Sequence, residues 1–89
     1  MASLNHLSAT EAVKKLAARE ITAVALLSDC LERIAAREPT VHAWTCVDAD
    51  GAMRRARALD AQAPTGLLHG LPIAVKDLFD TVDLPTGYG

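Results

Sequence analysis

The stretch from Leu71 to Val75, LPIAV, is almost wholly apolar and ends directly at Lys76. A surface strand would alternate polar and apolar residues, so this run predicts a short buried strand at Ile73-Ala74-Val75. A buried strand needs neighbouring strands on both sides. The other candidate strand is the segment Val41–Val47, VHAWTCV, which is rich in β-branched and aromatic residues. The pattern therefore predicts an α/β chain that forms the beginning of a longer protein.

Two helices are expected before these strands. The segment SATE at residues 8–11 has the form of a capping box and predicts a helix over Ala9–Arg19. Thr22 is placed to cap a second helix, and Pro39 is expected to end it at or before Glu38. The apolar stripe of this second helix consists of Val24, Leu27, Leu31 and Ile34, with Leu26 and Cys30 beside it.

A third helix is expected at residues 49–62, with Asp48 or Asp50 as its cap. Its apolar face holds Ala52, Met53, Ala56 and Leu59, and its basic cluster holds Arg54, Arg55 and Arg57. Acidic residues surround this cluster, which favours a solvated helix face over a binding patch. After the turn at residues 64–66 and the short strand, the chain from Asp80 onward reads as a loop that Phe79 and Val82 are expected to anchor.

Composition limits both the core and the class of partner. Apolar residues make up 51% of the 89 residues, but much of this is alanine, and there is one Trp, one Tyr and one Phe. Such a core is thin for an independent domain. The formal net charge is −2 and no basic stripe is present, so a nucleic-acid surface is not expected. We find no signal-peptide pattern and no apolar stretch near the roughly 20 residues of a membrane span, so the simplest compartment is the cytoplasm.

The two cysteines, Cys30 and Cys46, are too far apart for a CxxC motif, and no His pair has metal-ligand spacing. Their contexts are a helix and a strand interior. We therefore expect small buried apolar side chains, with a disulfide or a reactive thiol as the alternative.

Lys76 is the candidate for chemistry, and the residues alone allow two interpretations. It could be a solvated lysine at a strand end, paired with Asp77 or Asp80. It could instead lie in an enclosed site, since burial disfavours the charged form of a lysine and a neutral amine can accept a proton from a hydroxyl nucleophile.

The stretch from Gly66 to Gly89, GLLHGLPIAVKDLFDTVDLPTGYG, closely resembles the amidase signature family. The positions that match its pattern in register are Gly66, Leu68, Gly70, Pro72, Val75, Lys76, Asp77, Asp80, Thr81, Pro85, Thr86 and Gly89. Before Thr65 the resemblance is looser and consists of the capped helices, a strand and an alanine-rich helix. The resemblance as a whole implies that residues 1–89 are the N-terminal part of one amidase signature domain. Its parts would be a helical start (8–38), a strand (41–47), a helix (49–62) and the catalytic-lysine strand and loop (66–89).

The resemblance implies a mixed sheet flanked by helices and hydrolysis of a carbon–nitrogen amide bond, without a metal or an organic cofactor. Lys76 would be the catalytic lysine of a Ser–cis-Ser–Lys triad. Both triad serines would follow Gly89, because Ser3, Ser8 and Ser28 lack glycine-rich surroundings or act as a cap. The 89 residues alone would then be inactive.

The expected partner is a small-molecule amide substrate, with no nucleic acid and no membrane, and a homodimer remains open. Two alternatives are a segment of an aminoacyl-tRNA amidotransferase A-type subunit and a small helical interaction module without catalysis. Near the lysine, we expect Asp77 to bond backbone amides rather than Lys76 and His69 to be a loop residue. Trp44 is expected to serve packing.

Overall fold

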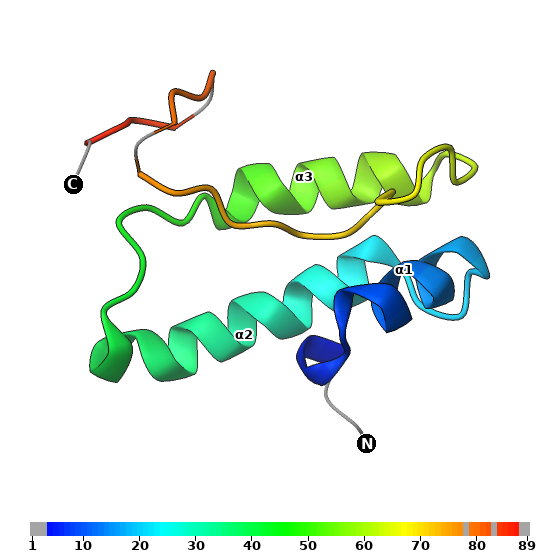
Figure 1. Ribbon diagram of the computed structural model, residues 1–89, viewed down its shortest axis with the longest axis horizontal. Coiled ribbons are helices and arrows are strands. Elements are labelled where there is room, and N and C mark those ends of the chain that lie inside the picture. Colours follow the sequence, from blue (N-terminus) through cyan, green and yellow to red (C-terminus); the bar gives the residue numbers. More distant parts are fainter. Residues whose placement is uncertain (1–3, 78, 83, 88–89) are drawn as a thin grey trace.

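A computed structural model describes residues 4–77, 79–82 and 84–87. Within them the elements are a 3₁₀ turn η1 (Leu4–His6) and the helices α1 (Ala9–Ala17), α2 (Ala23–Val41) and α3 (Ala49–Asp60). Helix α2 packs against α3 and η1. After α3 the chain turns back and runs past α3 in the view of Figure 1, leading into an extended arm that consists of residues 71–77. The described part of the chain contains helices and no strand, so the predicted α/β class is wrong.

The predicted helix starts are confirmed. Ser8 Oγ accepts the amide of Glu11, and Glu11 Oε1 accepts the amide of Ser8, which completes the capping box. Thr22 Oγ1 accepts the amide of Ala25 at 3.0 Å. Of the two candidate caps for α3, Asp48 is the one used, since its carboxylate accepts the amide of Gly51. Local sequence therefore determines where each helix begins.

The predicted end of α2 is wrong, because the helix includes Pro39 in its last turn and continues to Val41. The chain then leaves the helix through His42, which has a left-handed backbone (φ 52°) and donates its amide to the carbonyl of Glu38. The carboxylate of Glu38 also accepts the amides of Ala43 and Trp44 at 2.7 and 2.8 Å. These three bonds stabilise a helix end beyond the proline.

Both predicted strands are wrong. Val41 is the last residue of α2, and residues 42–48 form an exposed connection to α3. The segment Ile73–Val75 lies outside helix and strand, with Ile73 75% and Val75 47% exposed. A strand requires a second strand to bond its amides and carbonyls, and each candidate lacks one among the described residues.

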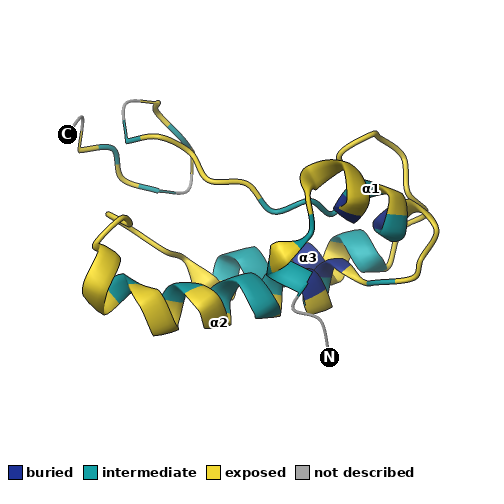
Figure 2. Ribbon diagram, turned by 60° about the horizontal axis from the view of Figure 1, so that its bottom comes forward, coloured by how far each residue is buried: buried dark blue, intermediate teal, exposed yellow. Residues whose placement is uncertain are grey.

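The buried core is small and lies where α1, the start of α2 and the middle of α3 meet (Figure 2). It consists of Ala12, Leu16, Ala23, Leu26 and Ala56. The radius of gyration is 13.6 Å, against about 12 Å for a compact chain of this length. The prediction of a thin core is confirmed, and the exposed C-terminal arm adds little to it.

Several apolar residues outside the core are exposed. Phe79 (59%) and Val82 (107%) do not anchor the C-terminal loop, so that prediction is wrong. Cys30 is half-buried against the core as expected, whereas Cys46 is exposed, because its predicted strand does not form. The basic cluster of α3 is exposed, which confirms the solvated helix face.

Long-range bonds join the three helices at one junction. Asp60, at the end of α3, accepts the amides of Ala23 and Val24 at 2.7 and 3.0 Å. Arg19, between α1 and α2, donates to the carbonyls of Asp60 and Gln62 at 3.3 and 2.7 Å. The end of α3 therefore caps the start of α2, and the lysine segment leaves from this junction.

Candidate functional site: the Lys76 segment

The segment that carries Lys76 begins on the helical junction. A turn at residues 66–71 is closed by bonds from the amide of His69 to Gly66 O and from the amide of Leu71 to Leu68 O, at 3.3 and 3.0 Å. The His69 ring lies 3.0 Å from the carbonyl of Leu59 through Nε2, and Leu71 packs against the core. His69 thus ties the turn to the end of α3, consistent with its predicted role as a loop residue.

Gly70 is required by this turn on two grounds. Its φ of +86° lies in a region that side chains disfavour, and an added Cβ would lie 3.3 Å from both Ala23 Cβ and Leu16 Cδ2. The backbone at Gly70 therefore approaches the core as closely as packing permits. This contact sets the direction in which residues 71–76 leave the helices.

Lys76 itself is exposed and lies near the end of the extended arm. Its carbonyl accepts the amide of Phe79 at 3.1 Å, so the chain turns immediately after the lysine. The described residues place the amine on an open surface, and the enclosed site predicted for it is not formed by them.

The turn after Lys76 is closed by Asp77. Asp77 Oδ1 accepts the amide of Gly87 at 2.6 Å, and a Cβ on Gly87 would lie 2.9 Å from Oδ2, so a larger residue there would displace the carboxylate. Thr86 Oγ1 donates to the carbonyl of Phe79 at 3.2 Å. The prediction that Asp77 bonds a backbone amide is confirmed. Lys76 therefore lies between two fixed points, the Leu71 turn and the Asp77 loop.

The remaining candidate groups have structural surroundings. Ser8 caps α1 and Ser28 is exposed on α2, while Ser3 lies outside the described residues. Burial, and to a smaller extent the nearby Asp29, raises the pKa of the Cys30 thiol above its usual range.

Among the described residues, no group of three or more His, Cys, Asp or Glu side chains could hold a metal ion. No helix in residues 4–77, 79–82 and 84–87 is long and apolar enough to cross a membrane.

The sequence reasoning missed two residues that position the segment. Asp60 and Arg19 connect the end of α3 to the start of α2 across some forty residues of chain. Their local sequence resembles that of any exposed helix end, because a bond to a distant backbone group leaves no spacing pattern. The only local signal is an acidic residue just before the loop to His69.

Comparison with known proteins identifies the family. A family model described as Amidase matches residues 25–89. The chain is 44% identical, over its full length, to the A-type subunit of the glutamyl-tRNA(Gln) amidotransferase from Acidothermus cellulolyticus, and it covers 18% of that protein. It is 42% identical over 97% of its length to an amidase from Pseudomonas putida, of which it covers 19%. The corresponding glutamyl-tRNA(Gln) amidotransferase A-type subunit from Chloroflexus aurantiacus is 44% identical over the full chain, which covers 19% of it.

No solved structure matches the chain at a significant level. The chain spans about a fifth of the length of the curated relatives it matches. The matched region contains α2 from Ala25 onward, α3, the Gly70 turn, Lys76 and the Asp77 loop. Because the family model matches most of the chain and the relatives are more than 40% identical to it, the chain belongs to the amidase family.

Proposed function

We propose that residues 1–89 form the N-terminal part of a single amidase domain that hydrolyses the carbon–nitrogen bond of a small amide, with Lys76 as the catalytic base. The observation that carries this proposal is the position of Lys76. It follows an apolar arm whose start is fixed by Gly70 and Leu71 and whose end is fixed by the bond between Asp77 and Gly87. A turn packed on the core before the lysine and a hydrogen-bonded loop after it suit a side chain whose amine must be held in place.

The proposed chemistry needs an amine without its proton. In the assembled domain the apolar arm would be covered, and enclosure disfavours the charged form of a lysine. The neutral amine would accept a proton from a bridging serine, which in turn accepts the proton of the serine that attacks the amide carbonyl. The protonated lysine would return this proton through the bridging serine to the leaving nitrogen, which departs as an amine and leaves an acyl-enzyme that water then hydrolyses. Both serines would come from residues that follow Gly89.

Asp77 supports this assignment by what its carboxylate binds. An anionic group directed at Lys76 would favour the charged ammonium and oppose base catalysis. One carboxylate oxygen of Asp77 instead accepts the amide of Gly87 and closes the loop after the lysine. Asp77 is therefore proposed as a positioning residue.

A second candidate function is release of ammonia from the side-chain amide of glutamine for transfer to an acyl acceptor, as part of a glutamyl-tRNA(Gln) amidotransferase A-type subunit. It is favoured by the relatives, since A-type subunits of that enzyme are as similar to the chain as the amidase is, at 44% and 42% identity. The described residues are shared by both candidates. The sequence that follows Gly89, and an assay for glutamine-dependent transfer with a partner subunit, would separate them.

The experiment tests Lys76 in a complete domain. Residues 1–89 replace the matching segment of the Pseudomonas putida amidase, and kcat/KM is measured on a simple primary amide. Lys76→Ala is expected to lower kcat/KM by at least about 10²-fold, the lower range for loss of a general base. Lys76→Arg is expected not to restore activity, because a guanidinium stays protonated.

Two controls accompany these variants. Lys14→Ala removes an exposed lysine of α1 and is expected to leave kcat/KM unchanged, as is His69→Ala apart from a loss of stability. Circular dichroism verifies that each variant is folded. A folded Lys76→Ala chimera with near-normal activity would show that Lys76 is a solvated surface residue. For the 89-residue chain alone we expect no amide hydrolysis and no labelling by a fluorophosphonate probe, and stoichiometric labelling would contradict that.

A further inference from the structure

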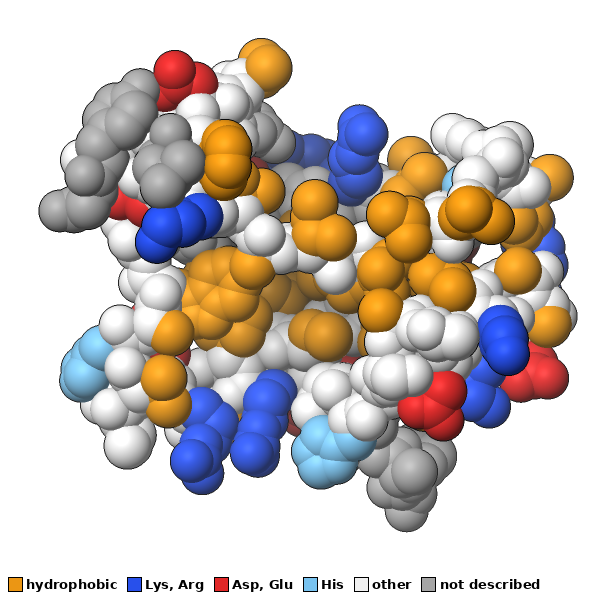
Figure 3. All heavy atoms as spheres, viewed as in Figure 1, with side chains coloured by type: hydrophobic (Ala, Val, Ile, Leu, Met, Phe, Trp, Pro, Cys, Tyr) orange, Lys and Arg blue, Asp and Glu red, His pale blue; other side chains and the backbone are white. Residues whose placement is uncertain are grey.

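An apolar groove lies between the C-terminal half of α2 and the connection to α3. Figure 3 shows apolar side chains gathered in a hollow between α3 and α2, with Lys and Arg side chains along its lower edge. A cavity of about 310 Å³ in this region is lined by Arg33, Ile34, Arg37, Glu38, Val41, Ala43 and Trp44, called here the Trp44 groove. Val41 is 54% exposed and Trp44 38%, so large apolar surfaces face solvent. Exposed apolar surface of this kind marks an interaction site.

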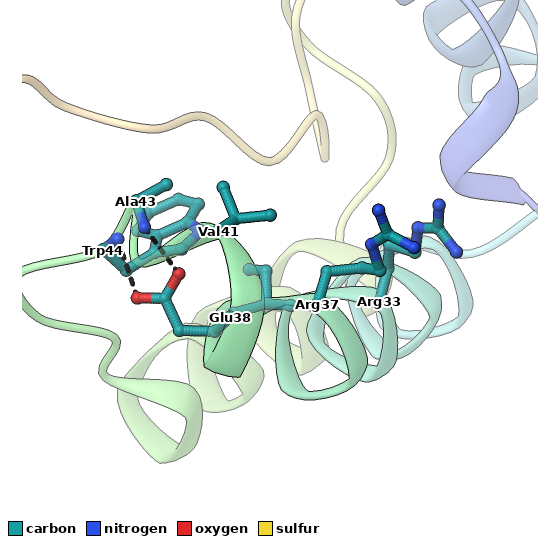
Figure 4. Close-up of a pocket in the computed structure, with 7 residues that line it drawn as sticks. Arg33, Arg37, Glu38, Val41, Ala43 and Trp44 are labelled. Carbon is teal, nitrogen blue, oxygen red and sulfur yellow. Dashed lines mark hydrogen bonds between the residues drawn. The ribbon is translucent and has the colours of Figure 1, made fainter.

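The groove has a charged rim as well as an apolar floor. Arg33 and Arg37 are one turn apart on α2, and neither forms an ion pair with another described residue. Glu38 does not neutralise them, because its carboxylate is bonded to the amides of Ala43 and Trp44, and the arginine side chains extend away from it (Figure 4). Two like charges at this spacing repel each other. A partner carboxylate would relieve that repulsion and pair with both.

Further large apolar residues are exposed outside the Trp44 groove. Val47 follows Trp44 in the connection to α3, and Ile73 and Val75 lie on the arm that carries Lys76. The curated relatives extend well beyond this chain, which covers only 18–19% of them. The remaining part of such a domain must pack against the segment that carries the lysine. The groove and the arm together offer the apolar surface for it.

We propose that the Trp44 groove is the docking site for the downstream part of an amidase domain, through an apolar segment that carries a carboxylate for Arg33 and Arg37. The proposal rests on the proposed function in one respect, the assignment of the chain to the N-terminal part of such a domain. A second copy of the chain is a poorer occupant. A two-fold symmetric contact of groove against groove would bring the arginine pairs of both copies into one interface and add to their repulsion.

The test measures how accessible the groove is to a thiol reagent. Cys30 and Cys46 are first replaced by Ala, and Ala43→Cys then places a thiol in the groove. The same variant is prepared in the 89-residue chain and in the chimera with the Pseudomonas putida amidase. Labelling in the chimera is expected to be at least about tenfold slower, since a covered site reacts only through local opening. Ala36→Cys is the matched control, because Ala36 is exposed on α2 and does not line the groove, and its labelling rate is expected to change little.

A second measurement tests the charge complementarity. The double variant Arg33→Glu/Arg37→Glu is expected to lower the Tm of the chimera more than Arg54→Glu/Arg55→Glu, which reverses two exposed arginines of α3. In the 89-residue chain, Arg33→Glu/Arg37→Glu is expected to lower the Tm no more than the control variant Arg54→Glu/Arg55→Glu. Equal effects of the two pairs in the chimera would overturn the role of the arginines.

Other outcomes also decide the question. Equal labelling of Ala43→Cys in the chain and in the chimera would overturn the proposal, as would a chimera that is expressed but not folded. Protection of Ala43→Cys in the 89-residue chain that rises with concentration would assign the groove to a second copy instead. The result is independent of the catalytic assignment, because Lys76→Ala is expected to remove activity in the chimera without changing the labelling of Ala43→Cys.

Discussion

Asp60 provides the sharpest test of how this chain holds its helices together. Its carboxylate accepts the amides of Ala23 and Val24 at 2.7 and 3.0 Å, so it satisfies two amides of the first turn of α2 from another helix. A side-chain bond to a helix N-terminal amide contributes about 0.5–2 kcal/mol. A negative charge at that end adds about 0.3–1 kcal/mol. Since Asp60 is half-buried, we expect Asp60→Ala to lower the free energy of unfolding by about 2 kcal/mol.

The Asp60→Asn variant separates the bond from the charge. The amide side chain keeps one acceptor oxygen but loses the charge and one bond, so its expected cost is about 1 kcal/mol. Glu32→Ala is the control, because Glu32 is an exposed acidic residue in the middle of α2. It is expected to stay within about 0.5 kcal/mol of the unsubstituted chain.

The assay is urea unfolding followed by circular dichroism at 222 nm. With a slope near 1 kcal/mol per molar urea for a small chain, Asp60→Ala shifts the midpoint by about 2 M. If the unsubstituted midpoint lies below that value, the variant loses its helical signal in plain buffer. A midpoint for Asp60→Ala equal to that of Glu32→Ala would refute the reasoning, because the two bonds would then contribute nothing to stability.

Three further outcomes are expected. Gly70→Ala should destabilise the chain by at least about 1 kcal/mol, whereas Gly66→Ala, whose Cβ would meet no atom within 4 Å, should not; equal unfolding midpoints would contradict this. The pKa of Asp29 is held below its ordinary value, first by the backbone amide of Asn5 and then by the side-chain amide of Asn5. The stability that the ionised carboxylate contributes is therefore complete above the ordinary pKa and is lost as pH falls through the lowered pKa. Asp29→Asn should make the free energy of unfolding depend less on pH in that interval. The isolated chain should be marginally stable or molten, or ordered only by self-association, and a sharp, concentration-independent two-state melt of a monomer would refute this.

The helix starts could be predicted because their causes are local. The Ser8–Glu11 box, Thr22 and Asp48 each bond amides within three residues of the cap, so the spacing in the sequence already contains the contact. The end of α2 could not be predicted in this way. Glu38 stabilises it with bonds to Ala43 and Trp44 beyond the proline, and Pro39 alone predicts an earlier end.

The strand predictions failed for a different physical reason. Apolar runs such as VHAWTCV and LPIAV indicate that a segment prefers to be covered, but a strand exists only when a second strand bonds its backbone. Within the described residues Ile73 and Val75 remain exposed. The same pattern that predicted a buried strand therefore describes an apolar surface without a cover.

The sequence by itself determined the family, the residues at which the helices begin and the position of the motif that contains Lys76. Each of these depends on residues close together in the chain or on a motif in register. Only the tertiary structure decided how the helices meet and where the lysine lies. Asp60 caps α2 from more than thirty residues away, and Gly70 packs its bare backbone against Leu16 and Ala23. Such contacts depend on the relative positions of whole elements, which arise when the apolar faces of the helices pack together and which no local spacing encodes.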